Sequence, residues 1–471
     1  MKPIRIAILI WCAIALLGLL CLLLPEQLTI GTVTLRWTTI AKVLGEKPTP
    51  VVVSDSLAMW EDTDTLEVAD TAVCEPVVPT VSTESAALEK KPKIEIPRVD
   101  TIGSTSTPSN AYLARFLAAL DEADERTVRV VHYGDSQIEE DRMTMTLRRA
   151  LQARYGGGGV GLIPLHQTIP TRTLSQTLTV NGKRQTTRQG LPRNLVYGPK
   201  AQRRKDGLYG MMGQVATVGH CDSTESVRDS LSFAVSPMGK KLYSESYFSR
   251  IRIWADGDFS YAVQGKNTLS KTQETMLLLS DSTTRCTLGM IGCGMVYGVS
   301  LETDRGVIVD NVPMRGSIGT VFMDIDSTQL ADFYRETNTR LIIMQFGGNA
   351  IPHNEKPGTI QGVVNSLRRQ IRYLRACAPE ADILFVGPGD MCTLIDGQMT
   401  TYPLLPYMDS LLRRMAAQEQ IAYFSLYQAM GGKDSMLRWQ KNGWAGSDGV
   451  HFTRRGAEIA GEKLVSFISG N

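Results

Sequence analysis

The sequence predicts an α/β protein: a mostly parallel sheet covered by helices, with a β-sandwich inserted into it. Two stretches of the chain alternate buried strand patterns with helical patterns, which is typical of such a sheet. The stretch between them has recurring strand patterns, turns containing Gly, Asn and Asp, and no long helical periodicity. The length of 471 residues, 43% of them hydrophobic, allows two or three domains with a sizeable core.

The N-terminal residues 1–25 have the pattern of a membrane anchor. Lys2 and Arg5 precede an almost unbroken apolar run over residues 6–24, which at about 1.5 Å per residue just crosses a hydrocarbon core of about 30 Å. Because the basic residues come first, we expect a cytoplasmic tip, a single pass through the inner membrane and a periplasmic body. A cleaved signal peptide is the alternative, but no small-x-small cleavage site follows the run, and Cys21 does not follow a small residue.

Residues 26–109 are predicted to be a short strand-like segment followed by a linker. Strand-like residues occur between Thr32 and Trp37, for which the sequence indicates no function. From about Lys47 the chain is rich in Pro, Thr, Ser, Val and acidic residues and has no sustained period, as in an extended linker. Such a linker would let the body stand away from the membrane.

The α/β domain is expected in two pieces, residues 110–163 and 305–471, which the insertion separates. Their strand patterns lie at residues 128–133, 307–309, 341–345, 383–386 and 421–424. Their helical patterns lie at residues 111–123, from 137 to about 155, 360–377, 407–418 and 455–468.

Residues 164–304 are predicted to form the inserted β-sandwich, a size normal for one domain. Strand patterns recur there at residues 249–254, 275–279 and 295–301. Several aromatic side chains of this domain either include a sugar-stacking face, which would make it carbohydrate-binding, or belong to its core: Trp254, Tyr243, Tyr247, Phe248 and Tyr261.

Charge and cysteine spacing exclude several classes of function. A net charge of +2 gives no reason to expect a nucleic-acid partner. The eight cysteines form no C-x-x-C pair, so we expect no structural metal site, and Cys286 and Cys293 either pair or stay as buried free thiols. We expect no cofactor, because the G-x-G-x-x-G match from Gly156 to Gly161 follows a helix, whereas the dinucleotide fingerprint follows a strand.

The segment Gly134-Asp135-Ser136 lies where a predicted strand ends and a helix begins. A serine there is exposed at the edge of the sheet where ligands bind in open α/β folds. The unpaired N–H groups and partial positive charge of a helix N-terminus would stabilise an oxyanion beside it. The alternative is an ordinary helix cap. Ser136 has no G-x-S-x-G around it, which disfavours an α/β-hydrolase elbow.

A nucleophilic serine needs a base, and His451 is the best candidate among five histidines. Asp448 precedes it by three residues in a predicted loop, so its carboxylate can hold one ring nitrogen while the other faces Ser136. The alternative is a capping group and a surface histidine. The other four lie on the serine's own strand, in or beside the insertion, or in a loop: His132, His166, His220 and His353.

Two more segments follow predicted strands and offer hydrogen-bond donors. Gly316 could present its backbone N–H to an oxyanion, or could be a turn glycine. Asn349, in Gly347-Gly348-Asn349, carries a donor amide next to glycines that let the backbone approach a ligand, or it could form a tight turn.

These four blocks, in this order, resemble the SGNH (GDSL-type) hydrolase family, over about residues 110–165 and 306–471. The resemblance implies a flavodoxin-like three-layer α/β/α fold. It assigns Ser136 as nucleophile, Asp448 and His451 as its partners, and an oxyanion hole made of the Ser136 and Gly316 N–H groups and the Asn349 amide. Ala350, where the family often has Asp, and Gln137, where Leu is commoner, mark a subfamily. With its long insertion, the chain is similar to bacterial peptidoglycan O-acetylesterases, which carry a carbohydrate-binding-type β domain.

The resulting hypothesis is a serine esterase that removes acyl, in particular acetyl, esters from a cell-envelope glycan through an acyl-enzyme. An O-acetyltransferase that uses the same three residues is one alternative. A non-catalytic, membrane-tethered glycan-binding protein is another. The partners implied are the acylated glycan, the inner membrane and a membrane acyltransferase.

Overall fold

The computed structural model describes residues 27–30, 33–36 and 109–470, except 187–189, 222–225, 264–265, 271–273 and 353. Of a first unit, residues 1–82, it describes an antiparallel hairpin of β1 (Gln27–Ile30) and β2 (Val33–Arg36). The predicted anchor and linker lie outside the described residues. Within the described residues, no helix combines the length and apolar character needed to cross a membrane.

A parallel five-stranded sheet forms the centre of the second unit, residues 83–471. Its order is β14 (Gly306–Pro313), β3 (Thr127–Gly134), β15 (Thr339–Gln345), β16 (Asp382–Val386) and β19 (Ala422–Phe424). In chain order this is second, first, third, fourth, fifth, the order of flavodoxin-type sheets. The predicted α/β fold with a mostly parallel sheet is confirmed.

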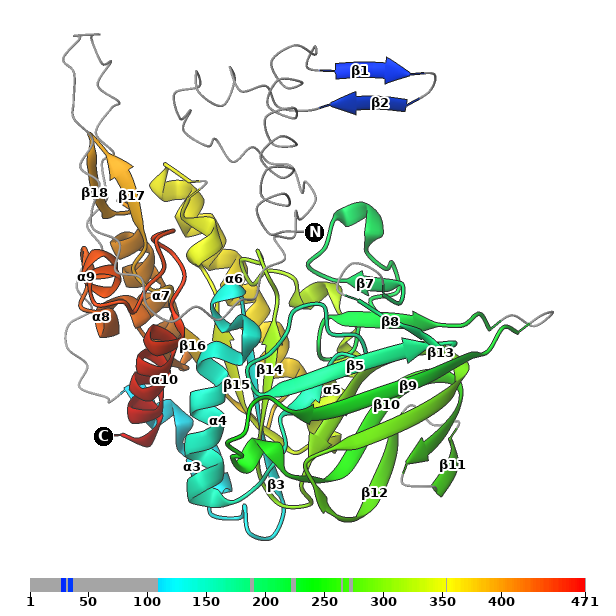
Figure 1. The fold of residues 1–471 in the computed structure, drawn as a ribbon. Coiled ribbons are helices and arrows are strands. Elements are labelled where there is room, and N and C mark those ends of the chain that lie inside the picture. The colour runs from blue at the N-terminus through cyan, green and yellow to red at the C-terminus, as the bar shows by residue number, and fades with distance from the viewer. Residues whose placement is uncertain are drawn as a thin grey trace, which may run out of the picture. The chain divides into compact units, whose positions relative to one another are not determined.

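Helices cover both faces of this sheet because its side chains are apolar on both faces (Figure 1). Along β3, Val128 and Val130 belong to one core, and Val131 and Tyr133 belong to the other. The first core contains side chains of α3 (Ala114–Leu120), α4 (Arg142–Tyr155), α8 (Leu426–Met430), α9 (Ser435–Lys441) and α10 (Arg454–Ser469). The second contains side chains of α5 (Ser327–Glu336), α6 (Pro357–Cys377) and α7 (Leu405–Glu419).

Several short elements were not predicted from the sequence. They include α5, α8, α9 and an antiparallel hairpin of β17 (Cys392–Ile395) and β18 (Gln398–Thr401). Short 3-10 helices add η1 (Ser109–Leu113), η3 (Lys200–Gln202), η4 (Ser244–Ser246) and η5 (Phe322–Asp324). The predicted first helix is accordingly η1 followed by α3.

The insertion is antiparallel, and its ten described strands are hydrogen-bonded in one network (Figure 1). Two strands, β10 (Phe248–Val263) and β13 (Cys286–Glu302), are long enough to pair in both halves of it. Between the halves, Gly257 and Gly294 face each other with φ of 146° and 137°, and side chains of both halves pack into one core. The remaining strands are β4 (Gly161–Ile163), β5 (Leu174–Val180), β6 (Lys183–Arg184), β7 (Arg193–Leu195), β8 (Gln214–Val218), β9 (Asp229–Pro237), β11 (Lys266–Ser270) and β12 (Glu274–Thr283). Because β4 pairs with β13, the inserted sheet begins slightly before residue 164.

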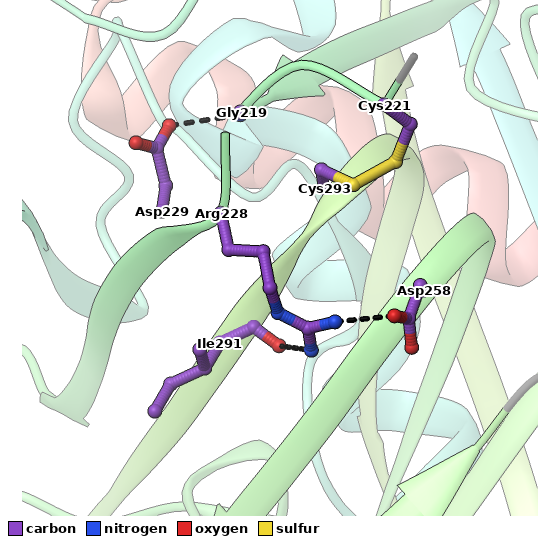
Figure 2. Close-up of a disulfide and its surroundings, with 7 residues drawn as sticks. All are labelled: Gly219, Cys221, Arg228, Asp229, Asp258, Ile291 and Cys293. Carbon is purple, nitrogen blue, oxygen red and sulfur yellow. Dashed lines mark hydrogen bonds and ion pairs between the residues drawn. A yellow bond between two sulfur atoms is a disulfide. The ribbon is translucent and has the colours of Figure 1, made fainter. Parts of the chain in front are cut away.

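Cys293 on β13 forms a disulfide with Cys221 (Figure 2). The suggested pair of Cys286 and Cys293 is wrong, because both lie on β13 and seven extended steps along the strand place their Cα atoms about 23 Å apart. The alternative of two free thiols is wrong for Cys293, and Cys286 is free and half-buried. Beside the disulfide, Arg228 binds Asp258 and donates to the carbonyl of Ile291.

A buried group of charges joins the inserted sheet to the parallel sheet. The Arg129 guanidinium on β3 donates to both Asp310 carboxylate oxygens on β14, at 2.7 and 2.9 Å, and to Glu302 on β13. Asp310 also accepts from the backbone N–H of Leu162 on β4 at 2.7 Å. Arg129, Glu302 and Asp310 are all at most 1% exposed, so each charge depends on the others for its stabilisation.

We predict that Arg129→Met lowers the free energy of unfolding by about 3–5 kcal/mol, because it removes the cation paired with the buried Asp310 and leaves Glu302 with Arg250 and Arg252 alone. Urea unfolding of both proteins measures this difference. The control is Arg305→Met, which removes a pair with Asp304 in which both side chains are more than 60% exposed. That change should cost less than about 1 kcal/mol. Equal losses in the two variants would contradict this account of the domain junction.

Candidate active site

The three blocks that follow β14, β3 and β15 meet at one edge of the sheet, as expected. Gly134, the last residue of β3, pairs with Pro313 on β14 and with Gln345 on β15. Ser136 lies two residues beyond the end of β3, Gly316 three residues beyond the end of β14, and Asn349 four residues beyond the end of β15. The register of the sheet therefore brings together segments that are far apart in the chain.

The turn that carries Ser136 is a 3-10 helix, η2 (Ser136–Asp141), not the start of one long helix. The Asp135 carboxylate caps it and accepts from the backbone N–H of Gln137 at 3.0 Å. Glu140 and Asp141 adopt left-handed conformations with φ of 58° and 64°, and α4 begins only at Arg142. Such strained backbone persists only where neighbours hold it in place.

Ion pairs and hydrogen bonds hold these two strained residues. Glu140 binds Arg142 at 2.8 Å and Arg172, from the inserted domain, at 2.9 Å. Buried Asp141 binds Arg148 of α4 and accepts from the Thr173 hydroxyl at 2.9 Å. The inserted domain therefore braces the turn that positions Ser136.

Ser136, His451 and Asp448 form a continuous hydrogen-bonded chain. The Ser136 Oγ lies 2.8 Å from the His451 Nε2, and the His451 Nδ1 lies 2.7 Å from an Asp448 carboxylate oxygen. The other Asp448 oxygen accepts from the backbone N–H groups of Val450 and His451, each at 3.0 Å. Burial acts to raise the pKa of Asp448, but these hydrogen bonds outweigh it and hold that pKa below its ordinary value. An ionised Asp448 fixes the proton on Nδ1 and leaves Nε2 to accept from the serine hydroxyl.

The histidine loop is tied to its neighbours on both sides. The Gln137 side-chain amide donates to the Val450 carbonyl at 2.6 Å, and the Cys392 N–H donates to the Gly449 carbonyl at 3.0 Å. Gly449 has φ of 69°, and a Cβ there would lie 2.6 Å from the Cys392 Sγ. Glycine is therefore needed for the loop to reach Ser136.

Asn349 borders the same site, but its amide is already engaged. It lies in η6 (Gly348–Ala350), and its Nδ2 donates to the Ser317 carbonyl at 3.1 Å and to Asp135 at 3.3 Å. An oxyanion would have to replace one of these acceptors. Gly316 has φ of 73° in the turn after β14, and the preceding Arg315 makes a two-pronged ion pair with Glu139 of η2.

A cavity of about 50 Å³ opens beside Ser136. It is lined by Asp135, Ser136, Gln137, Gln345, Phe346, Gly348, Asn349, Pro352, Pro388, Gly389, Met391 and Val450. Burial raises the pKa of Asp135 to about 6, the Gln137 N–H and His451 oppose the rise, and Glu139 adds to it. The cavity thus combines an apolar part with a carboxylate that is difficult to ionise.

The loop between β16 and β17, residues 387–391, supplies part of this cavity and was missed in the sequence. Buried Asp390 pins it by accepting from the Thr401 hydroxyl and the Met436 N–H, each at 2.8 Å. The available signal was its position: Gly387-Pro388-Gly389-Asp390 follows the fourth parallel strand, whose carboxyl end lies at the ligand-binding edge.

Other candidates from the sequence lie elsewhere. His132 is buried between Thr144 and Gln345, and burial, with a smaller effect of Arg148, lowers its pKa to about 4. His353 lies outside the described residues, and among the residues that are described no group of His, Cys, Asp and Glu could hold a metal ion.

The five aromatic side chains suggested as a sugar-stacking face do not form one. Phe248 and Tyr261 belong to the core of the inserted sheet, and Trp254 packs against Phe333 of α5. Tyr243 lies against the Arg149 guanidinium at 3.6 Å, which leaves Tyr247, 43% exposed, as the accessible ring. The core alternative is therefore right for three of them.

No protein-family model matches the sequence, and no curated protein matches it. A solved peptidoglycan O-acetylesterase is similar over 78% of this chain and 97% of its own, with 21% identity and a TM-score of 0.57. An acetyl xylan esterase matches over 34% and 80%, with 16% identity and a TM-score of 0.27. A family two carbohydrate esterase from Clostridium thermocellum matches over 60% and 98%, with 10% identity and a TM-score of 0.25. The first likeness confirms the predicted resemblance at the level of the fold.

The raised pKa of Asp135 predicts how stability depends on pH. Because the folded protein binds this proton more tightly than the unfolded chain does, the contribution of Asp135 is fully present below about pH 4 and is lost as the pH rises through about 6. Between pH 4 and 7 the wild type should lose up to about 3 kcal/mol of unfolding free energy relative to Asp135→Asn. Urea titrations at several pH values measure this gap, and a gap that stays constant would show that Asp135 has an ordinary pKa.

Proposed function

We propose that this protein is a serine esterase that removes small acyl groups, in particular acetyl, from hydroxyl groups of a cell-envelope glycan. The observation that carries the proposal is the hydrogen-bonded chain of Asp448, His451 and Ser136, which opens beside a small cavity. A serine hydroxyl bonded to a histidine that a carboxylate orients is the arrangement that acyl transfer requires. The fold shared with a peptidoglycan O-acetylesterase supports the choice of an acetylated glycan as substrate.

The geometry supports a two-step reaction. His451 Nε2 takes the proton of Ser136 Oγ as the oxygen attacks the ester carbonyl carbon. The bond between that carbon and the glycan oxygen then breaks, and the glycan oxygen takes the proton from His451. A water molecule next gives its proton to His451 and attacks the acyl-serine. Collapse returns the proton to Ser136 Oγ and releases the carboxylic acid.

Charge stabilisation comes from three directions. The ionised Asp448 stabilises the imidazolium that forms in each step. The oxyanion would accept from the backbone N–H groups of Ser136 and Gly316 and from the Asn349 amide. The amide donates there by exchanging its contact with Ser317 or Asp135 for one with the substrate.

Water is the acceptor that this site favours over a sugar hydroxyl. An O-acetyltransferase would use the same residues and differ only in the second step. The His451 side chain is 36% exposed, so bulk water reaches the base that must activate it. Exclusion of water is what a transferase needs, and an exposed base does not provide it.

Ser136→Ala and His451→Ala should each abolish most hydrolysis of p-nitrophenyl acetate by the purified protein. The double variant should lose little more, because the two residues act as one unit. Asp448→Asn should give an intermediate loss. Asn349→Ala should lower kcat on the order of 10² to 10³-fold, as for one oxyanion donor.

The matched control for Ser136→Ala is Ser366→Ala on α6, whose hydroxyl accepts only an exposed hydrogen bond from Arg369 among the contacts described. It should keep wild-type activity. Release of acetate from native envelope glycan tests the substrate class. If Ser136→Ala and His451→Ala hydrolyse every acyl ester as fast as the wild type does, Ser136 is a helix cap and the binding-protein alternative replaces the esterase.

We further propose that residues 6–24 anchor the protein in the inner membrane with its body in the periplasm. The length and apolar character of that run support the anchor, and the Cys221–Cys293 disulfide supports an oxidising compartment. The full-length protein should therefore sediment with membranes. A protease that reaches the periplasmic side of the inner membrane should digest its body. A mature N-terminus beginning after Pro25, found by N-terminal sequencing, would contradict the anchor.

A further inference from the structure

Two loops next to Ser136 form facing walls of its cavity. One follows β15 and contains Gly348 and Asn349, and the other follows β16 and contains Pro388 and Met391. The two loops approach each other closely, so small changes in either side chain alter the space beside Ser136.

The backbone conformation at Gly348 does not require a glycine. Its neighbour Gly347 has φ of 118°, and a Cβ there would lie 2.8 Å from the Met408 side chain, so Gly347 is required by the turn. Gly348 does not have a positive φ. A Cβ at Gly348 would lie 3.6 Å from the Met391 Sδ, 3.7 Å from an Asp135 carboxylate oxygen and 3.9 Å from the Pro388 Cβ. These are ordinary contacts, and all three partners line the cavity, so the added methyl would occupy the cavity itself.

Met391 forms the opposite wall and cannot withdraw with its backbone. It is 4% exposed, and the preceding Asp390 is fully buried and pinned by Thr401 and Met436. The following Cys392 N–H bonds to the Gly449 carbonyl in the histidine loop. Because the loop backbone is fixed, the space in the cavity on this side depends on the Met391 side chain.

The size of the cavity fits a short acyl chain. At about 10–15 Å³ per water, a cavity of about 50 Å³ holds roughly four water-sized groups. An acetyl group has three non-hydrogen atoms, whereas a butyryl group has five. We infer that Gly348 and Met391 together limit the acyl group that this site accepts to about the size of acetyl, an inference that rests on the proposed esterase function.

The test compares kcat/KM for p-nitrophenyl acetate, propionate and butyrate in opposite variants. Met391→Ala enlarges the cavity and should raise the butyrate-to-acetate ratio by about 10-fold or more, since one methylene in an apolar pocket changes kcat/KM by about 10–200-fold. Gly348→Ala fills the cavity and should lower the propionate-to-acetate ratio by about 10-fold. A loss of general structure would lower all three esters alike and leave both ratios unchanged.

Two control variants make the same kinds of substitution away from the cavity. Met399→Ala removes a half-exposed methionine from the neighbouring β18, and Gly362→Ala adds a methyl on α6 where nothing lies within 4 Å. Both should keep the wild-type ratios.

Three outcomes decide the matter. Opposite shifts in the two variants support the size limit. Wild-type ratios in both, with acetate still hydrolysed, overturn the inference and leave the esterase standing. A wild type that is inactive on all esters overturns the proposed function itself. If Met391→Ala does not fold, the ratio for Gly348→Ala decides alone.

Discussion

The parallel pairing of β14, β3 and β15 is the constraint on which the site depends. Gly134 pairs with both Pro313 and Gln345, the last residues of β14 and β15, so the segments that follow the three strands begin side by side at the same edge of the sheet. A slip of one residue would turn every side chain of a strand to the other face of the sheet. The buried pair of Arg129 and Asp310 resists such a slip on the β14 side, because the slip would separate two charges that are both buried. The ion pair that stabilises the domain junction thereby also fixes the position of Ser136.

The inserted domain has a structural role in the site, whatever it binds. It enters the chain between α4 and β14, and it returns Arg172 and Thr173 to the turn that carries Ser136. These side chains hold Glu140 and Asp141 in left-handed conformations that the backbone alone disfavours. Arg315, next to Gly316, binds Glu139 in the same turn. The serine and the second oxyanion donor are therefore positioned by one set of acidic residues, and the buried face of the insertion helps to keep that set in place.

Local pattern was enough to predict the parallel strands, to place Ser136, Gly316 and Asn349 soon after their ends, and to place His451 in the loop before the last helix. Buried parallel strands are short apolar runs, and polar residues that follow them stand out. Features that depend on which distant segments contact each other could not be predicted from the sequence. The partner of Cys293 lies on another segment, and the strands of the insertion join in one network because β10 and β13 pair along nearly their whole lengths. The contact of the Asn349 amide with Asp135 joins two blocks of the sequence that carry no sign of each other. Aromatic residues were ambiguous for the same reason, since composition does not show which face of a strand is buried.

Covalent labelling of Ser136 tests the central claim most directly. A fluorophosphonate reacts with a serine only where a neighbouring base activates the hydroxyl, so it reports the Ser136–His451 pair without any assumption about the glycan. The account predicts that intact-mass spectrometry shows one label per chain, that peptide mapping places it on Ser136, and that His451→Ala prevents labelling. Absence of labelling in the folded wild type, or a label on another serine with Ser136 unmodified, would contradict the account.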